Sequence, residues 1–189
     1  MAGLRILHCF RAPIGGLFRH VGDLARAQEA LGHSVGLVAD ARSGGETADH
    51  KLATLGHALS LGVLRVPMPR HAGPGDITAA RRIGAHIRDL APDVIHGHGA
   101  KGGAYARIVS APSSIRVYTP HGGSLHYTRK SPVGFAYLEA ERLFARRTDL
   151  FLFESAYGER VFEARVTSTN GRARVVHNGL PEQDFERIA

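Results

Sequence analysis

The chain has 189 residues, which is enough for one domain with a sizeable hydrophobic core. Its hydrophobic fraction of 43% and charged fraction of 22% exclude a disordered or fibrous protein, and no apolar run is long enough to span a bilayer. The formal net charge of +7 favours anionic partners such as phosphates, nucleic acid or an anionic membrane. The single cysteine, Cys9, excludes an intramolecular disulfide, and the amino terminus lacks a secretory pattern. We therefore expect a cytoplasmic protein.

Apolar runs of strand length alternate with segments of helical periodicity along the chain. Because the apolar runs are continuous, they favour a parallel sheet covered by helices on both faces. The sequence therefore predicts a single α/β domain with a Rossmann-like, doubly wound, mainly parallel sheet of about six to seven strands. Strands are expected at 4–9, 34–39, 63–66, 93–96, 115–119, 150–153 and 173–177, and helices at 17–31, 48–57, 77–90, 101–109, 132–147 and 156–166.

A glycine pair, Gly15-Gly16, separates the first predicted strand from the first predicted helix. Doubly wound sheets bind ligands beyond the carboxyl ends of their strands, which is where this pair lies. Glycines let the backbone approach a ligand, and the helix behind them offers free N–H groups to an anion such as the phosphate of a sugar nucleotide. The three glycines of the dinucleotide fingerprint are absent, so a flexible connection without a ligand is the alternative interpretation.

Polar, glycine-rich segments also follow three later strands, at residues 96–103, 119–126 and 177–179. The carboxyl ends of parallel strands meet on one side of a sheet, so these segments predict one shared site. Lys101 is expected near the start of a helix, where it would need an anionic ligand. These segments contain the candidate binding residues His98, Lys101, Gly122 and Asn178 together with His121, and the candidate His20 lies on the first predicted helix.

A metal site is not predicted among these segments. His96 and His98 are expected to point to opposite faces of the sheet, and no acidic or thiolate side chain is spaced to complete a tetrahedron with them. A serine hydrolase is not supported either, because the G-x-S-x-G elbow is absent. No metal or other cofactor is therefore expected.

Four motifs occur in order and together cover nearly the whole chain. They are Gly15-Gly16-x-x-x-His20-Val21, then Asp93-Val94-Ile95-His96-x-His98-x-x-Lys101-x-Gly103, then Tyr118-Thr119-Pro120-His121-Gly122, and Val176-x-Asn178-Gly179. In this order they resemble the N-terminal domain of the group 1 glycosyltransferases of family 4, which have the GT-B fold.

The resemblance implies the acceptor-binding half of a nucleotide-sugar-dependent, retaining glycosyltransferase that acts in glycan or glycolipid synthesis without a metal. By motif, Gly15 and Gly16 would lie near the donor diphosphate, and His121 would contact the donor sugar near the reacting centre, which makes it the candidate catalytic residue. The other matches are His98 and Lys101 in a loop on the acceptor side, and Asn178-Gly179 just before the interdomain linker. The implied partners are a nucleotide-sugar donor and a saccharide or lipid-linked acceptor.

Domain organisation follows from the same resemblance. Residues 1–180 are expected to form the Rossmann-like domain, and residues 181–189 to begin the interdomain linker. The family's C-terminal domain, which binds most of the nucleotide, is not in this sequence. We therefore expect this domain alone not to catalyse transfer efficiently.

Two other functions stay open. The first is a non-catalytic module that binds a phosphorylated or lipid-linked saccharide. The second is a basic surface that attaches to nucleic acid or an anionic membrane, formed by Arg81, Arg82, Arg88, Arg142, Arg146 and Arg147. Peripheral contact with the inner face of a membrane is also compatible with the transferase, since many acceptors are lipid-linked. A nucleic-acid partner is not expected, because no aromatic-rich nucleic-acid motif is present.

Overall fold

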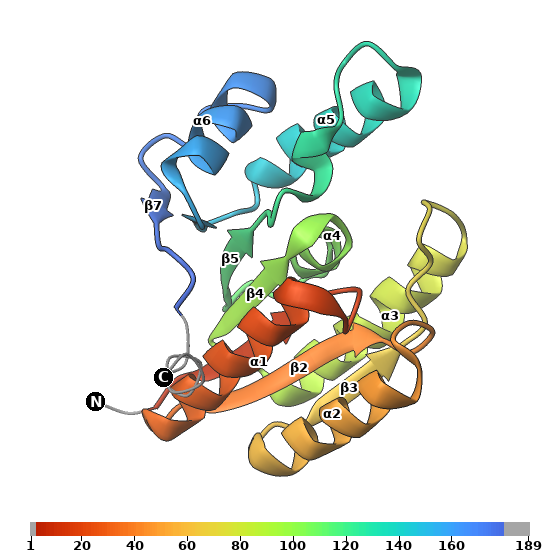
Figure 1. The fold of residues 1–189 in the computed structure, drawn as a ribbon, viewed down its shortest axis with the longest axis vertical. Coiled ribbons are helices and arrows are strands. Elements are labelled where there is room, and N and C mark those ends of the chain that lie inside the picture. The colour runs from red at the N-terminus through yellow and green to blue at the C-terminus, as the bar shows by residue number, and fades with distance from the viewer. Residues whose placement is uncertain (1–2, 180–189) are drawn as a thin grey trace, which may run out of the picture.

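A computed structural model describes residues 3–179, so the linker predicted at residues 181–189 lies outside the described residues. The described residues form a seven-stranded sheet in the order β3-β2-β1-β4-β5-β6-β7, with every neighbouring pair parallel (Figure 1). The strand order reverses direction between β1 and β4, and this switch point is where doubly wound sheets bind ligands. The predicted fold class is confirmed.

Strands and helices alternate from end to end. The strands are β1 (Arg5–Cys9), β2 (Ser34–Asp40), β3 (Val63–Val66), β4 (Val94–His98), β5 (Ile115–Thr119), β6 (Leu150–Phe153) and β7 (Ala173–Val175). The helices are α1 (Gly15–Ala30), α2 (Gly45–Ala58), α3 (Gly75–Leu90), α4 (Gly99–Ile108), α5 (Pro132–Ala145) and α6 (Ala156–Arg165), with a 3₁₀ turn η1 (Gly123–His126).

Three boundaries differ from the prediction in ways that matter for the site. The helix α1 begins at Gly15, so the glycine pair forms its first turn rather than a turn before it. The strand β4 continues to His98, so the histidines after its apolar run are strand residues. The helix α3 begins at Gly75, two residues before its predicted start, so Asp76 lies in its first turn.

Helices cover both faces of the sheet and each face has its own apolar core. On one face α1 and α2 pack Val21 and Leu52 against the strands, and these helices lie in front of the sheet in Figure 1. On the other face α3 and α4 pack Ile83 and Ala106 against them. Each large apolar side chain buried in this way contributes about 1.5–3 kcal/mol relative to exposure.

The helix α4 packs unusually close to the sheet because glycines form its contact surface. A Cβ added at Gly102 would lie 2.2 Å from the carbonyl oxygen of Cys9, and one added at Gly103 would lie 2.2 Å from Cε2 of Tyr118. No side chain fits at either distance. The glycines that follow Lys101 therefore seat α4 directly on β1 and β5, which fixes its amino-terminal end beside the switch point.

The predicted basic surface lies on the α4 side of the sheet. All six of its arginines are exposed on or just after α3 and α5, and both of these helices contact α4. Attachment of this surface to an anionic membrane stays a prediction. Among the described residues, no helix combines the length and the apolar composition needed to cross a bilayer.

Candidate functional site

The amino-terminal ends of α1 and α4 both lie at the switch point. In neither helix does a side chain cap the first N–H groups, and neither has an acidic residue in its first turn. Each of the other four described helices has a serine cap or an acidic residue there. The two helix ends at the switch point therefore keep free N–H groups and a partial positive charge, which favours an anionic ligand.

Glycines bring the loops at this point close together. A Cβ at Gly99 would lie 3.5 Å from Cδ1 of Leu17, and one at Gly123 would lie 3.0 Å from the backbone nitrogen of Ala100. Gly15 has a positive φ of 69°, and a Cβ there would meet no other atom within 4 Å. The loop after β1 therefore keeps an open backbone beside the loops after β4 and β5.

Buried histidines fill the space between α1 and the sheet. His8 of β1 and His96 of β4 are register partners, and the ring centroids of His96 and His98 lie 3.9 Å apart. His8, His96 and His98 are 0%, 5% and 1% exposed. The prediction that His96 and His98 point to opposite faces is wrong, because residues i and i+2 of a strand share a face.

Three histidines link α1 to the segment after β6 through consecutive short contacts, which we call the histidine network. Gln28 Oε1 lies 2.7 Å from Nε2 of His8, and Nδ1 of His8 lies 2.9 Å from Nε2 of His98. Nδ1 of His98 lies 3.0 Å from Nε2 of His121, whose Nδ1 lies 2.5 Å from Oε1 of Glu154. The network therefore consists of Gln28, His8, His98, His121 and Glu154.

Two further predicted residues meet this network at His121 and Glu154. The half-buried ring of His20 stands edge-on to that of His121, with centroids 5.5 Å apart. The side chain of Asn178 hydrogen-bonds Glu154. Gly122 follows His121 in a left-handed turn, with a φ of 72° after a φ of 49°. The structure thus gathers four predicted residues around one buried ring.

Burial controls the charge state of the network. It lowers the pKa of His8 to about 4 and lowers the pKa values of His96 and His98 well below the usual range. Burial also lowers the pKa of His20, with a smaller contribution from His121. A hydrogen bond from His121 lowers the pKa of the Glu154 carboxyl, against the opposing effect of burial. At neutral pH His8, His20, His96 and His98 are therefore uncharged and Glu154 is ionised.

This burial predicts that the fold loses stability in acid. The pKa of His8 is about 4 in the folded state and about 6.5 when unfolded, so the unfolded chain binds more protons as the pH falls from about 6.5 to about 4. That difference removes about 3 kcal/mol from the free energy of unfolding, and His96 and His98 act in the same direction. Urea unfolding across this pH range measures the loss.

Matched variants identify its source. In His8→Gln the free energy of unfolding should decrease less steeply as the pH is lowered. His50→Ala removes an exposed histidine of α2 and should leave the dependence of the free energy of unfolding on pH unchanged. Equal slopes in all three proteins would contradict a buried neutral His8.

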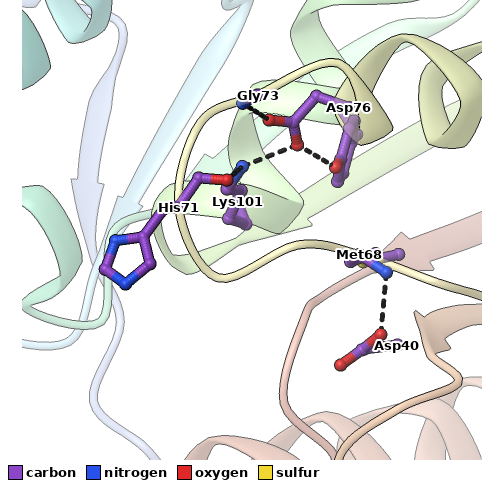
Figure 2. A network of polar contacts seen from close by, with 7 residues as sticks. Asp40, Met68, His71, Gly73, Asp76 and Lys101 are labelled. Carbon is purple, nitrogen blue, oxygen red and sulfur yellow. Dashed lines mark hydrogen bonds and ion pairs between the residues drawn. The ribbon is translucent and has the colours of Figure 1, made fainter.

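Lys101 does not join the histidine network. Its ammonium group lies 2.6 Å from Oδ1 of Asp76 and 3.3 Å from the carbonyl oxygen of His71, and the same carboxylate accepts a hydrogen bond from Tyr105 (Figure 2). Oδ2 of Asp76 also accepts from the backbone of Gly73. The anion that Lys101 was expected to need is thus supplied by the protein, and Lys101 ties α4 to the start of α3. A role on the acceptor side stays a prediction.

The three buried histidines come close enough to suggest a metal. His8, His96 and His98 each offer one ring nitrogen, and these three nitrogens lie within 4.8 Å of one another. Two imidazoles on one tetrahedral zinc ion have ring centroids about 5 Å apart and bonded nitrogens about 3.3 Å apart. The ring of His8 lies 5.2 Å from each of the other two rings, but the rings of His96 and His98 lie only 3.9 Å apart, tilted by 33°. His8 and His98 also share a hydrogen bond of 2.9 Å. The arrangement fits hydrogen-bonded rings better than metal ligands.

Sequence reasoning missed four residues at this end of the sheet. His8 was counted within an apolar strand, and Gln28 and Glu154 lie far from the motifs. Arg11, just after β1, has a buried Nε that lacks a hydrogen-bond partner among the described residues. The alternation of side chains in a parallel strand could have placed His96 and His98 on one face. The contacts of Gln28 and Glu154 depend on packing.

Comparison with known proteins agrees with this geometry. Residues 15–179 match the model of the glycosyl transferase 4-like domain. The chain belongs to this family. The match includes all four sequence motifs, so the resemblance to the N-terminal domain of group 1, family 4 glycosyltransferases is confirmed. No curated protein matches the sequence of this glycosyl transferase 4-like domain.

Solved structures show the same fold at low sequence identity. A glycosyltransferase from Rickettsia africae ESF-5 superimposes with a TM-score of 0.66 at 16% identity, over 100% of this chain and 49% of that one. Anabaena HepE, in complex with UDP and glucose, gives 0.66 at 17% identity over 98% and 49%. A sucrose-phosphate synthase structure from Thermosynechococcus elongatus gives 0.62 at 13% identity over 96% and 94%. The chain spans about half the length of the first two, as one half of a GT-B enzyme does.

Proposed function

We propose that this domain is the acceptor-binding half of a nucleotide-sugar-dependent glycosyltransferase that retains the configuration of the transferred sugar and needs no metal. The observation that carries the proposal is the pair of uncapped helix ends at the switch point. Anabaena HepE is described in complex with UDP and glucose, and a plant starch synthase IV with ADP and acarbose. A diphosphate has the charge that two such helix ends favour.

The site supplies the electrostatic part of transfer. When the bond from the sugar to the diphosphate breaks, negative charge develops on the leaving diphosphate, and fixed N–H donors stabilise that charge more in the transition state than in the ground state. The N–H groups of Gly15 and Gly16 lie in the first turn of α1 and can act as such donors. A second domain that closes over this end of the sheet would exclude water from the reacting bond.

A pocket beside His121 gives the sugar a place to bind. It has a volume of about 340 Å³ and is lined by Gly122, His126 and Glu154. Of these, Glu154 is in contact with the His121 ring. That is room for about ten water molecules. Both ring nitrogens of His121 are engaged, so a sugar hydroxyl reaches the ring by exchanging with a protein partner. Glu154, with its side chain 31% exposed, is the accessible one.

A transfer assay on the full-length protein tests the proposal. Nucleoside diphosphate release is measured from a panel of UDP-, ADP- and GDP-sugars, with and without saccharide and lipid-linked acceptors. We expect acceptor-dependent release from one donor, with the anomeric configuration of the product unchanged by NMR. Saccharide binding without release from any donor would instead support the non-catalytic module.

Removal of metal ions is expected to leave this rate unchanged. The hydrogen bonds that join His8 to His98 and His98 to His121 support this proposal, in which fixed N–H groups supply the charge stabilisation. Dialysis against EDTA, followed by the same assay with and without added Mg²⁺ or Zn²⁺, measures the effect. A rate lost on dialysis and restored by either ion would contradict the metal-free proposal.

A further inference from the structure

The histidine network holds more protons than three neutral imidazoles carry. It contains four hydrogen bonds, which run from Gln28 through His8, His98 and His121 to Glu154. Each bond requires one proton, and three neutral rings supply only three. Both ends of the network are acceptors: the amide oxygen of Gln28 and the ionised carboxylate of Glu154. One ring must therefore carry two protons.

The position of that second proton follows from the end groups. Gln28 Oε1 accepts from Nε2–H of His8, which leaves Nδ1 of His8 to accept from Nε2–H of His98. Nδ1 of His98 then accepts from Nε2–H of His121, and the carboxylate of Glu154 accepts from Nδ1–H of the same ring. His121 alone lies beside an anion, whereas His8 and His98 are fully buried without one.

We infer that Gln28, His8 and His98 are positioning residues that keep His121 doubly protonated, so that it presents a fixed positive charge at the carboxyl end of the sheet. Gln28 lies at the far end of the network from His121, on α1. It acts through the tautomers of two intervening rings, because each ring that donates from one nitrogen accepts at the other.

The charged groups around His121 fit this assignment. Glu154, which follows β6, is the anion in contact with its ring. His20 on α1 and His96 and His98 on β4 face it as well, and burial lowers the pKa of each of these three. They are therefore uncharged at neutral pH and do not oppose a cation on His121.

The function of this charge rests on the proposed transferase activity. A cationic His121 beside the two uncapped helix ends would add to the stabilisation of a leaving diphosphate or bind a sugar hydroxyl as a charged donor. The protonation state itself does not depend on that activity, so it can be measured without a donor.

Histidine ¹⁵N NMR of the full-length protein at neutral pH tests the inference. We expect both nitrogens of His121 to be protonated, and both His8 and His98 to carry their proton on Nε2. In Gln28→Leu one acceptor is gone, so three bonds need only three protons. His8 and His98 should then switch to Nδ1–H, and His121 should carry a single proton, on Nδ1, at neutral pH.

Two further variants separate the effect from a change in folding. Gln28→Glu keeps an acceptor oxygen but also places an anion beside His8, so it should keep four protons on the three rings while the second proton can move from His121 to His8. Glu154→Gln removes the anion beside His121 and should leave that ring with a single proton at neutral pH. If Gln28→Leu does not fold, the tautomers of His8 and His98 in the wild-type protein decide, because Nδ1–H on His8 would overturn the inference.

Two results of these measurements would overturn the inference. A neutral His121 with Nδ1–H on His8 in the wild type would mean that the amide nitrogen of Gln28 faces the ring, and would overturn the inference. Tautomers unchanged in Gln28→Leu would do the same. If the wild-type protein shows the expected ¹⁵N shifts but transfers no sugar, the inference stands and only the proposed function is contradicted.

Discussion

Replacement of His121 by alanine in the full-length protein is expected to lower kcat on the order of 10²–10³-fold, as loss of a donor or acid–base group at a reacting centre does. The ring contacts His98 and the Glu154 carboxylate, and it lies beside the pocket that Gly122 and Glu154 line. Steady-state transfer rates measure the effect. The KM for the donor should change much less than kcat if His121 acts mainly in the transition state.

The control is His50→Ala, which removes an exposed histidine from α2, far in sequence from the network. Its transfer rate should equal that of the wild type. Because the His121 side chain is only 7% exposed, the free energy of unfolding of His121→Ala must be measured as well. A folded His121→Ala protein with an unchanged rate would remove His121 from the site.

Replacement of Glu141 by alanine is expected to lower the free energy of unfolding by about 3–5 kcal/mol, because it leaves a buried cation without its anion. The side chains of Arg107 and Glu141 are 0% and 4% exposed, and Nη2 lies 2.9 Å from Oε2. Tyr118 donates its hydroxyl proton to the other carboxylate oxygen at 2.9 Å. The guanidinium group also lies 3.6 Å from the Tyr118 ring centroid. Urea unfolding measures the loss.

Two comparisons sharpen this prediction. Glu139 lies on α5, as Glu141 does, and Glu139→Ala breaks an exposed ion pair with Arg129, which precedes that helix. Its cost should stay below about 1 kcal/mol. The double variant Arg107→Met with Glu141→Leu removes both charges and should recover most of the lost stability. A loss in Glu141→Ala no larger than in Glu139→Ala would show that the pair is not buried in solution.

The sequence predicted the fold well because its signals were local. Continuous apolar strands indicated a parallel sheet, and three predicted strands, among them 63–66 and 115–119, have the predicted boundaries. The predicted boundaries were wrong where polar residues extend a strand beyond its apolar run. His96 and His98 belong to β4 although they are polar, because they pair with β5 and lie buried under α1. Glycines usually end helices, yet Gly15 and Gly16 begin one.

The sequence predicted which of the candidate site residues lie close together but not which side chains they contact. The motifs placed His20, His98, His121 and Asn178 on one side of the sheet, and the structure brings them together. No local pattern shows that Lys101 is paired with Asp76, which lies 25 residues earlier. Likewise, the contacts of His8 with Gln28 and of His121 with Glu154 depend on how α1 and β6 pack. Tertiary packing, rather than spacing, decides such contacts.

Binding of a donor at the two uncapped helix ends is the central claim, and backbone amide NMR tests it most directly. The full-length protein is titrated with the nucleotide-sugar that the transfer assay selects, or with UDP-glucose. The account predicts saturable shifts of the N–H signals of Gly15, Gly16 and Gly99, with those of Arg81 and Arg82 on α3 unchanged. Shifts confined to the arginine surface, or none at the three glycines, would contradict it.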